Sequence, residues 1–286
     1  MKTSAPPISA YHGRLMPNFD DEKPCRYGCV YCFAVNPKFY NDEARPKPMS
    51  VADARELVRA TLEMSGGNVD FISSACSREV FMDPAEGVAH VKVLAEVGDY
   101  KKNVVFPTKT ALSQETINEL VEIDKRLKEN GRRVAMQMSF VSGRERPDLE
   151  RKTPLVASRI QATLRLKDAN IAVGVYIRPI LPSVYVATEE ILELVDRTSH
   201  IAAYTIGAEF AFTDNIASKM RLDLSDPDVQ AHTRWNQPLP FAPSSPIWHI
   251  FNDPRGERII ADIKSRGKQA FEHAGDTLDF LVSDKS

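Results

Sequence analysis

The residues with the clearest chemical potential form one short run with three cysteines. Cys25, Cys29 and Cys32 occur in the sequence Cys-Arg-Tyr-Gly-Cys-Val-Tyr-Cys. Three thiolates in one loop can bind three irons of a cubic iron-sulfur cluster and leave the fourth iron open to another ligand. The spacing therefore predicts a 4Fe-4S cluster with one open coordination position.

Two other interpretations of the cysteine run are weaker. Zinc sites normally use four protein ligands, or an open position built with His or carboxylate, often in paired CxxC knuckles. The sequence has no second knuckle. A disulfide scheme would leave one thiol over, and residues 1–10 lack the charged start and apolar stretch of a secretory signal. We therefore expect reduced thiols and a cytoplasmic location.

Length and composition favour one medium-sized enzyme. The chain has 286 residues, of which 43% are hydrophobic, enough to bury a large core. No apolar run approaches the roughly 20 residues that cross a bilayer, so we expect no membrane association. The formal net charge of -2 removes any whole-protein electrostatic argument for nucleic acid binding. We interpret the charged run 144–152 as a solvated loop, with a local basic face as the alternative.

Apolar strands alternate with amphipathic helices, a pattern that predicts an α/β fold with a parallel sheet. The six expected strands are 8–12, 69–74, 103–108, 133–140, 171–177 and 202–208. Between them we expect helices near 51–62 and 85–97, and helices opened by Ser113, by Thr153 with Pro154 at the first position, and by Thr188.

The alternation stops after Glu209. Residues 210–254 are rich in proline and predict mostly loop with one short helix. A helix over 255–273 and an apolar strand over 278–282 are expected to follow. We divide the chain into a barrel with the cysteine loop (1–212) and a loop-rich cap or lid (213–286). A structural wrap or a dimer contact remains an alternative role for the second part.

The cysteine run, with Tyr31 and Phe33 flanking its last cysteine, resembles that of the radical S-adenosylmethionine (radical SAM) superfamily. The resemblance implies an open (β/α)6 partial barrel of the TIM type and a 4Fe-4S cluster whose open iron binds S-adenosylmethionine. It also implies reductive cleavage of that cofactor to a 5'-deoxyadenosyl radical, which abstracts hydrogen from an organic substrate. A flavodoxin- or ferredoxin-type protein would donate the electron, and Phe33 would pack near the adenine.

Motifs at successive strand ends resemble the spore photoproduct lyase branch of this superfamily over about 24–212. They are Ser73 to Ser77, Thr108 to Thr110, Ser139 and Gly174 to Ile180. In that branch a cysteine at the position of Cys76 returns hydrogen to the substrate radical. Tyrosines on both sides of the last cluster cysteine relay the radical. Here Tyr31 is present but Phe33 has no hydroxyl, so the relay needs a substitute or the cofactor is consumed. A buried Cys76 acting as a small hydrophobe is the alternative.

The resemblance also implies the residues that hold the cofactor. Ser73, Ser74 and Ala75 would meet the methionyl ammonium through their backbone, Lys109 the methionyl carboxylate, and Ser139 the ribose or carboxylate. Ordinary helix caps and a solvent-directed lysine are the alternatives. Arg178 and Glu209 follow the fifth and sixth expected strands. We expect them to contact the substrate or the cofactor, and an ordinary buried ion pair is the alternative.

The substrate is open. We expect a radical SAM enzyme that acts on a peptide, a small metabolite or a nucleic acid. Within this class, a lyase that repairs a thymine photoproduct in DNA is one alternative. From another class, the chain could be a non-catalytic iron-sulfur electron carrier or a nucleic-acid-binding protein.

Overall fold

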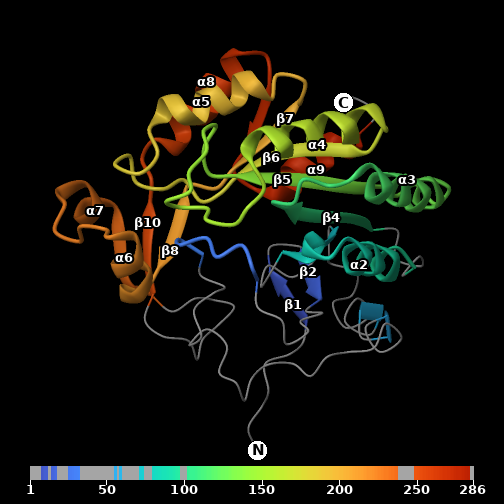
Figure 1. Cartoon of the computed structure of the whole chain (residues 1–286), viewed down its shortest axis with the longest axis horizontal. Coiled ribbons are helices and arrows are strands. Elements are labelled where there is room, and N and C mark those ends of the chain that lie inside the picture. Colours follow the sequence, from blue (N-terminus) through green and yellow to red (C-terminus); the bar gives the residue numbers. More distant parts are fainter. Residues whose placement is uncertain are drawn as a thin grey trace, which may run out of the picture.

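A computed structural model of the chain describes residues 8–11, 14–17, 25–32, 55–56, 58–59, 71–73, 79–96, 102–237 and 248–283. These residues form an eight-stranded sheet with helices packed along it, and a smaller three-stranded sheet beside it (Figure 1). The order of the large sheet is β1-β2-β3-β4-β5-β6-β7-β11, and that of the small sheet is β8-β10-β9.

The large sheet is mainly parallel. Its strands are β1 (Ile8–Tyr11), β2 (Arg14–Pro17), β3 (Phe71–Ser73), β4 (Asn103–Thr108), β5 (Val134–Phe140), β6 (Ala172–Ile177), β7 (Ala203–Ile206) and β11 (Gln269–Phe271). β2 to β7 run parallel in chain order, β11 adds a parallel strand at one edge, and β1 is antiparallel at the other. Within the described chain the two edge strands do not pair with each other. The predicted α/β fold with an open partial barrel is confirmed.

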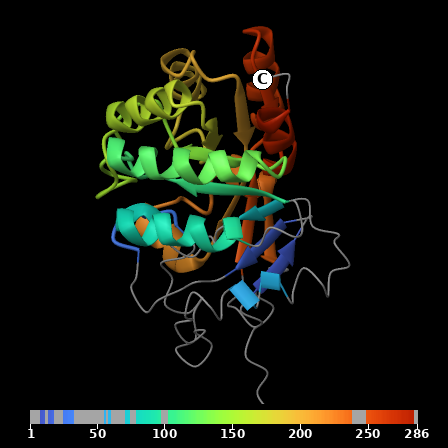
Figure 2. The same cartoon turned by 90° about the vertical axis from the view of Figure 1, so that its right-hand side faces the viewer.

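Four helices connect consecutive parallel strands: α2 (Pro84–Glu96), α3 (Gln114–Lys128), α4 (Val156–Asp168) and α5 (Thr188–Arg197). A 3-10 turn, η3 (Val80–Met82), precedes α2. Figure 2 shows α2 and α3 side by side along β4. Each of these helices buries an apolar face against the strands, as expected for a repeated βα unit. None of the helices in the described ranges is both long and apolar enough to cross a membrane.

The predicted start of α3 is confirmed, whereas the predicted starts of α4 and α5 differ from the structure. Ser113 caps α3 as expected, because its Oγ accepts a hydrogen bond from Thr116 N at 3.3 Å. The expected start of α4 at Thr153 is wrong, since the helix begins at Val156. The carboxylate of Glu145, eleven residues earlier, accepts from Val156 N at 2.7 Å and replaces a local cap. Thr188 is the first residue of α5 rather than its N-cap.

Two expected strands are also corrected. The segment at 8–12 is the antiparallel edge strand β1, and the first parallel strand is β2 at Arg14–Pro17. The apolar run 278–282 lies in a helix, α9 (Ala274–Val282). Short apolar runs are ambiguous between helix and strand, and here Leu278 and Leu281 lie one turn apart on the buried face.

The expected helix at 255–273 is divided into α8 (Gly256–Ser265) and β11. Gly267, with φ +73°, follows α8 and permits the left-handed conformation that ends it.

The segment after β7 is more regular than its composition predicts. It forms β8 (Glu209–Phe212), α6 (Asp214–Met220), α7 (Pro227–His232), β9 (Thr233–Gln237) and β10 (Trp248–Asn252). Residues 238–247, which carry four of its prolines, lie outside the described residues. Strands from both sides of residue 212 share each sheet, because β8 pairs with β10 and β7 pairs with β11. The cap or lid role of 213–286 stays a prediction.

Helix α9 closes one face of the large sheet. Leu278 and Leu281 pack against one buried side chain from each of five neighbouring strands, namely Phe71, Val105, Ala135, Ala172 and Ala203. A Cβ atom at Gly174 would lie 3.1 Å from Leu281 Cδ1, so glycine there permits the close approach of α9 to β6. The C-terminal helix is therefore part of the core that supports the strand ends.

Replacing Leu278 by alanine should lower the free energy of unfolding by about 2–5 kcal/mol, because a fully buried side chain is removed from a packed core. Val184→Ala, at a 74% exposed position, is the matched control and should change it by less than about 0.5 kcal/mol. Urea denaturation measures both. Equal effects of the two substitutions would contradict the position of α9.

Candidate functional site

The three cysteines lie on a partly buried loop. Cys29 is buried at 6% exposure, whereas Cys25 and Cys32 are half-buried, and no disulfide joins any two of these three cysteines. Cys32 N donates to Cys29 O at 3.1 Å and closes a turn between the last two cysteines. Burial raises the pKa of Cys29 to about 12, and the opposing charge of Lys109 only reduces this effect. The thiol is therefore neutral until a metal displaces its proton.

Residues after two neighbouring strands hold this loop. Val30 N donates to Leu149 O at 2.9 Å, and Lys152 N donates to Tyr27 O at 3.2 Å. The Tyr27 hydroxyl shares a hydrogen bond of 2.6 Å with Thr110 Oγ1. Because Thr110 follows β4 and residues 149–152 belong to the connection after β5, the cysteine loop lies at the carboxyl ends of these strands. Active sites of βα barrels form at this end.

A buried cluster of charges lies beneath the loop. Lys109 Nζ donates to Glu150 Oε1 at 2.7 Å and to Ser139 Oγ at 3.2 Å. Arg159 donates to Glu150 Oε2 at 2.6 Å and to the Ser139 carbonyl at 2.8 Å. The Tyr31 hydroxyl donates to Glu150 Oε1 at 2.5 Å. Glu150 thus joins the cysteine loop, the end of β4 and helix α4.

The electrostatics of the cluster fix its protonation. Burial opposes ionisation of Glu150, but the charges of Lys109 and Arg159 outweigh it and lower the pKa to about 2. Burial, reinforced by the Glu150 charge, raises the pKa of Tyr31 well above its usual value. Near neutral pH the cluster therefore contains an ionised carboxylate and a neutral phenol.

A second buried carboxylate shapes the turn at Lys109. Glu79 Oε1 accepts from Thr108 Oγ1 at 2.7 Å and from Phe81 N at 3.1 Å, and Glu79 Oε2 accepts from Lys109 N at 2.6 Å. Burial raises the pKa of Glu79, although these donors oppose the shift. Its role is to hold the backbone where the Lys109 side chain departs from β4.

The structure brings together one part of the predicted site. Cys29, Tyr31, Lys109 and Ser139 lie in or next to the buried cluster. Ser73 is fully buried at the end of β3, in register with Val105 of β4. Phe33, Ser74, Ala75 and Cys76 lie outside the described residues, so their roles stay predictions.

Arg178 and Glu209 occupy different surroundings. Arg178 follows β6, and its guanidinium donates to the Tyr176 hydroxyl at 2.8 Å. Glu209 begins β8 and forms an exposed ion pair with Arg234 at 2.6 Å. Neither of these two contacts involves a residue of the buried cluster around Glu150. Their roles as substrate or cofactor contacts stay predictions.

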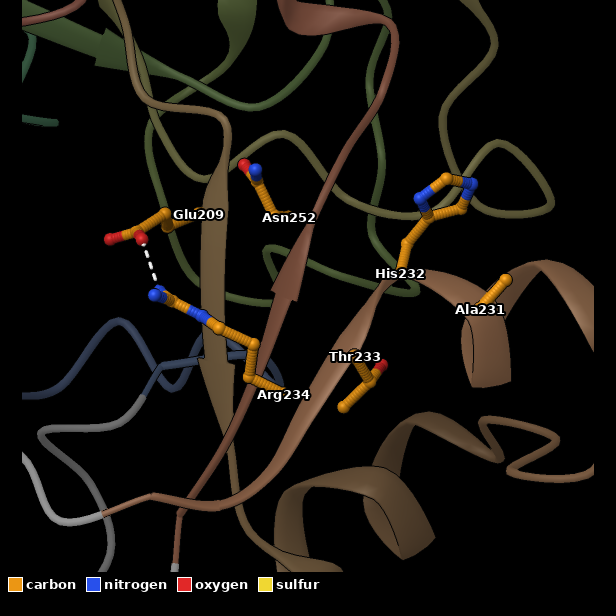
Figure 3. A pocket seen from close by; sticks show the side chains of 6 residues that line it. All are labelled: Glu209, Ala231, His232, Thr233, Arg234 and Asn252. Atoms are coloured by element: carbon orange, nitrogen blue, oxygen red, sulfur yellow. Dashed lines mark hydrogen bonds and ion pairs between the residues drawn. The ribbon is translucent and has the colours of Figure 1, made fainter.

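A shallow cavity of about 310 Å³ lies on the small sheet (Figure 3). Its lining comes from β8, α7, β9 and β10, and consists of Glu209, Ala231, His232, Thr233, Arg234 and Asn252. The ion pair between Glu209 and Arg234 crosses it. No cysteine, Lys109 or Glu150 is among the lining residues, so we place the candidate chemistry at the cysteine loop.

Sequence reasoning missed Glu150 and Arg159. The run 144–152 was interpreted as a solvated loop, yet Leu149 and Glu150 are 2% and 7% exposed. An apolar Leu149 within a charged run was the available signal. Arg159 is 1% exposed on α4 and carried no separate signal in the sequence.

The donor chemistry of the loop fits an iron-sulfur cluster. Thiolates are the usual ligands of such clusters, and the loop carries three of them. In the described part of the chain, no group of three or more His, Cys, Asp or Glu side chains converges to hold a single metal ion. A cubane makes no such demand, because each cysteine binds a different iron.

Comparison with solved structures finds a similar fold in several structures of spore photoproduct lyase. The complex with a dinucleoside spore photoproduct has a TM-score of 0.59 and 14% identity, covering 88% of this chain and 74% of that chain. A tyrosine-to-phenylalanine variant of the lyase has a TM-score of 0.60 and 15% identity, with the same coverage. A double variant with bound AdoMet and the dinucleoside has a TM-score of 0.56 and 14% identity, covering 86% and 72%.

These likenesses confirm the expected resemblance at the level of the fold. The chain shares the fold of spore photoproduct lyase. Comparison with protein-family models gives no match. Comparison with curated protein sequences gives no match either.

Replacing Glu150 by glutamine should lower the free energy of unfolding by about 3–5 kcal/mol, because it leaves two buried cations without a counter-ion. The folded-state pKa of Glu150 is depressed to about 2, so its stabilising contribution is present above the unfolded value of about 4.3 and is lost as the pH falls toward about 2.

Denaturation at several pH values measures this prediction. The difference between the natural chain and Glu150→Gln should shrink between about pH 5 and about pH 2. A difference that stays constant over this range would show that Glu150 is not held as a paired carboxylate.

Proposed function

We propose that this chain is a radical SAM enzyme that acts on an organic substrate. The observation that carries the proposal is a loop of three cysteines at the carboxyl ends of β4 and β5, hydrogen-bonded through Tyr31 to a buried charge cluster. The shared fold with spore photoproduct lyase supports it.

The residues divide the work of this proposed site. Cys25, Cys29 and Cys32 would hold a 4Fe-4S cluster, and Ser73, Ser74, Ala75, Lys109 and Ser139 would hold S-adenosylmethionine. When bound, the cluster and cofactor would supply a 5'-deoxyadenosyl radical for hydrogen abstraction. Lys109 provides a positive charge that is only 16% exposed, and such a charge attracts a carboxylate more strongly than one in water. Phe33 would lie against the adenine.

Cys76 is the proposed hydrogen donor. Its support is the sequence position that it shares with the donor cysteine of the spore photoproduct lyase branch, 44 residues after Cys32 (76 minus 32). Donation moves one hydrogen atom from the thiol to a substrate carbon radical and leaves a sulfur radical. The Tyr31 hydroxyl hydrogen is committed to Glu150, which favours consumption of the cofactor over a tyrosine relay.

Several further parts of the proposal rest on resemblance. A flavodoxin- or ferredoxin-type protein would reduce the cluster, and residues 213–286 would act as a lid that excludes water from the radical. Arg178 and Glu209 would contact substrate or cofactor. A cytoplasmic location suits the reduced thiols.

A second candidate is repair of a thymine photoproduct in DNA, which the likeness to spore photoproduct lyase favours. The net charge of -2 gives no support for strong binding to phosphates. Binding of irradiated duplex DNA at physiological salt would favour repair. Its absence, with cofactor cleavage retained, would favour a peptide or small-molecule substrate.

Anaerobic reconstitution with iron and sulfide, followed by dithionite and S-adenosylmethionine, should yield 5'-deoxyadenosine, measured by liquid chromatography. Cys29→Ala should abolish its formation because the cluster loses a ligand. Val184→Ala, at an exposed position, is the control and should retain it. An intact cluster that yields no 5'-deoxyadenosine would favour the electron-carrier alternative.

Replacing Cys76 by alanine should preserve 5'-deoxyadenosine formation but divert the substrate radical to other products, because the returning hydrogen is lost. Mass spectrometry of the products measures the change once a substrate is identified. An unchanged distribution of products would remove Cys76 from the mechanism.

A further inference from the structure

Glu150 lies between the cysteine loop and the residue proposed to bind the cofactor. Its Oε1 accepts from both Tyr31 and Lys109, and its Oε2 accepts from Arg159. We propose that Glu150 is a positioning residue: it orients the Lys109 ammonium for a carboxylate-bearing ligand and ties that orientation to the cysteine loop. The inference rests on the proposed function, in which the ligand is S-adenosylmethionine.

Two hydrogen bonds hold the Lys109 ammonium in one orientation. An ammonium has three N–H donors. Within the described residues, Glu150 and Ser139 accept two of them, at 2.7 and 3.2 Å. One donor is left for a ligand, and the two fixed partners restrict its direction. A lysine without them would lose more side-chain entropy on binding, so this arrangement favours affinity.

The charges around Glu150 favour an anionic group of the ligand. Lys109 and Arg159 are cations, and Glu150 is the anion between them, so these three groups together carry one excess positive charge. In addition, Arg159 Nε is buried and has no hydrogen-bond partner among the described residues. Excess positive charge in a buried site is relieved by an anion. The ion pairs therefore favour an anionic group of the ligand next to Lys109.

Access distinguishes the two cations. The Arg159 side chain is 1% exposed and is held behind β5 by its bond to the Ser139 carbonyl. The Lys109 side chain is 16% exposed and lies 5.6 Å from the centre of the Tyr31 ring. Lys109 is therefore the cation that meets a ligand, and Arg159 keeps Glu150 ionised and in place.

Tyr31 connects this cluster to the cysteine loop. Its hydroxyl donates to the same Glu150 oxygen that accepts from Lys109, at 2.5 Å. A hydroxyl that returned hydrogen to a radical would need to direct its hydrogen at that radical. Tyr31 instead anchors the loop, so that one carboxylate oxygen fixes both the cluster ligands and the ligand-binding ammonium.

The test compares two ligands that differ in the amino acid part. Binding of S-adenosylmethionine and of 5'-methylthioadenosine, which lacks the ammonium and carboxylate and has a neutral sulfur, is measured by equilibrium dialysis with the reconstituted, unreduced protein. Glu150→Gln should weaken S-adenosylmethionine binding about tenfold to hundredfold, because a charge-assisted contact loses its orientation. The affinity for 5'-methylthioadenosine should stay within about twofold.

Glu190→Gln is the matched control. Glu190 also accepts from an arginine and a serine, Arg146 and Ser142, but has no bond to Lys109 or to the described part of the cysteine loop. It should leave both affinities within about twofold. If Glu150→Gln weakens both ligands equally, or weakens neither, the positioning role is wrong.

Arg159→Lys decides the question if Glu150→Gln does not fold. It retains the positive charge but replaces the guanidinium that binds both Glu150 and the Ser139 carbonyl by a single ammonium, so Glu150 is held less firmly. It should weaken S-adenosylmethionine binding about three- to tenfold and leave the affinity for 5'-methylthioadenosine within about twofold. Equal affinity for S-adenosylmethionine before and after this change would overturn the inference. If the unaltered protein binds neither ligand, the proposed function itself fails.

Discussion

The ion pairs of the Glu150 carboxylate are the interaction on which the candidate site depends. Two cations and a phenol from three separate parts of the chain meet on this one buried group. Burying charges is unfavourable unless every partner is present. The cysteine loop, the end of β4 and helix α4 therefore hold a single arrangement together. Loss of Glu150 leaves the two cations without their counter-ion.

The parallel sheet makes this meeting possible. Lys109 and Ser139 follow each other across neighbouring strands, because Thr108 of β4 pairs with Met138 of β5. Helix α9 packs against one face of the large sheet, and the helices that connect its strands pack against the other face. The candidate site lies at the carboxyl ends of the strands, where the strand pairing stops and side chains can converge.

Much of the fold could be predicted, since buried parallel strands such as β5 and β6 are continuous apolar runs. The start of α3 could be predicted from Ser113 because this N-cap bonds to a residue only three positions later, Thr116. Cys29 and Lys109 were identified through motifs and spacing. Glu150 was missed because its partner Lys109 lies 41 residues away, a pairing that only the folded chain creates. The helix at Leu278 is predicted wrongly as a strand because an apolar run of five residues is too short to show whether its period is that of a helix or a strand.

The proposed site requires a cubane with one iron open to the cofactor. Mössbauer spectroscopy of the protein reconstituted anaerobically with 57Fe, with and without S-adenosylmethionine, tests this most directly. We predict a four-iron cluster in which one iron changes its isomer shift when the cofactor is added. A protein that binds no cubane, or one whose four irons ignore the cofactor, would contradict it.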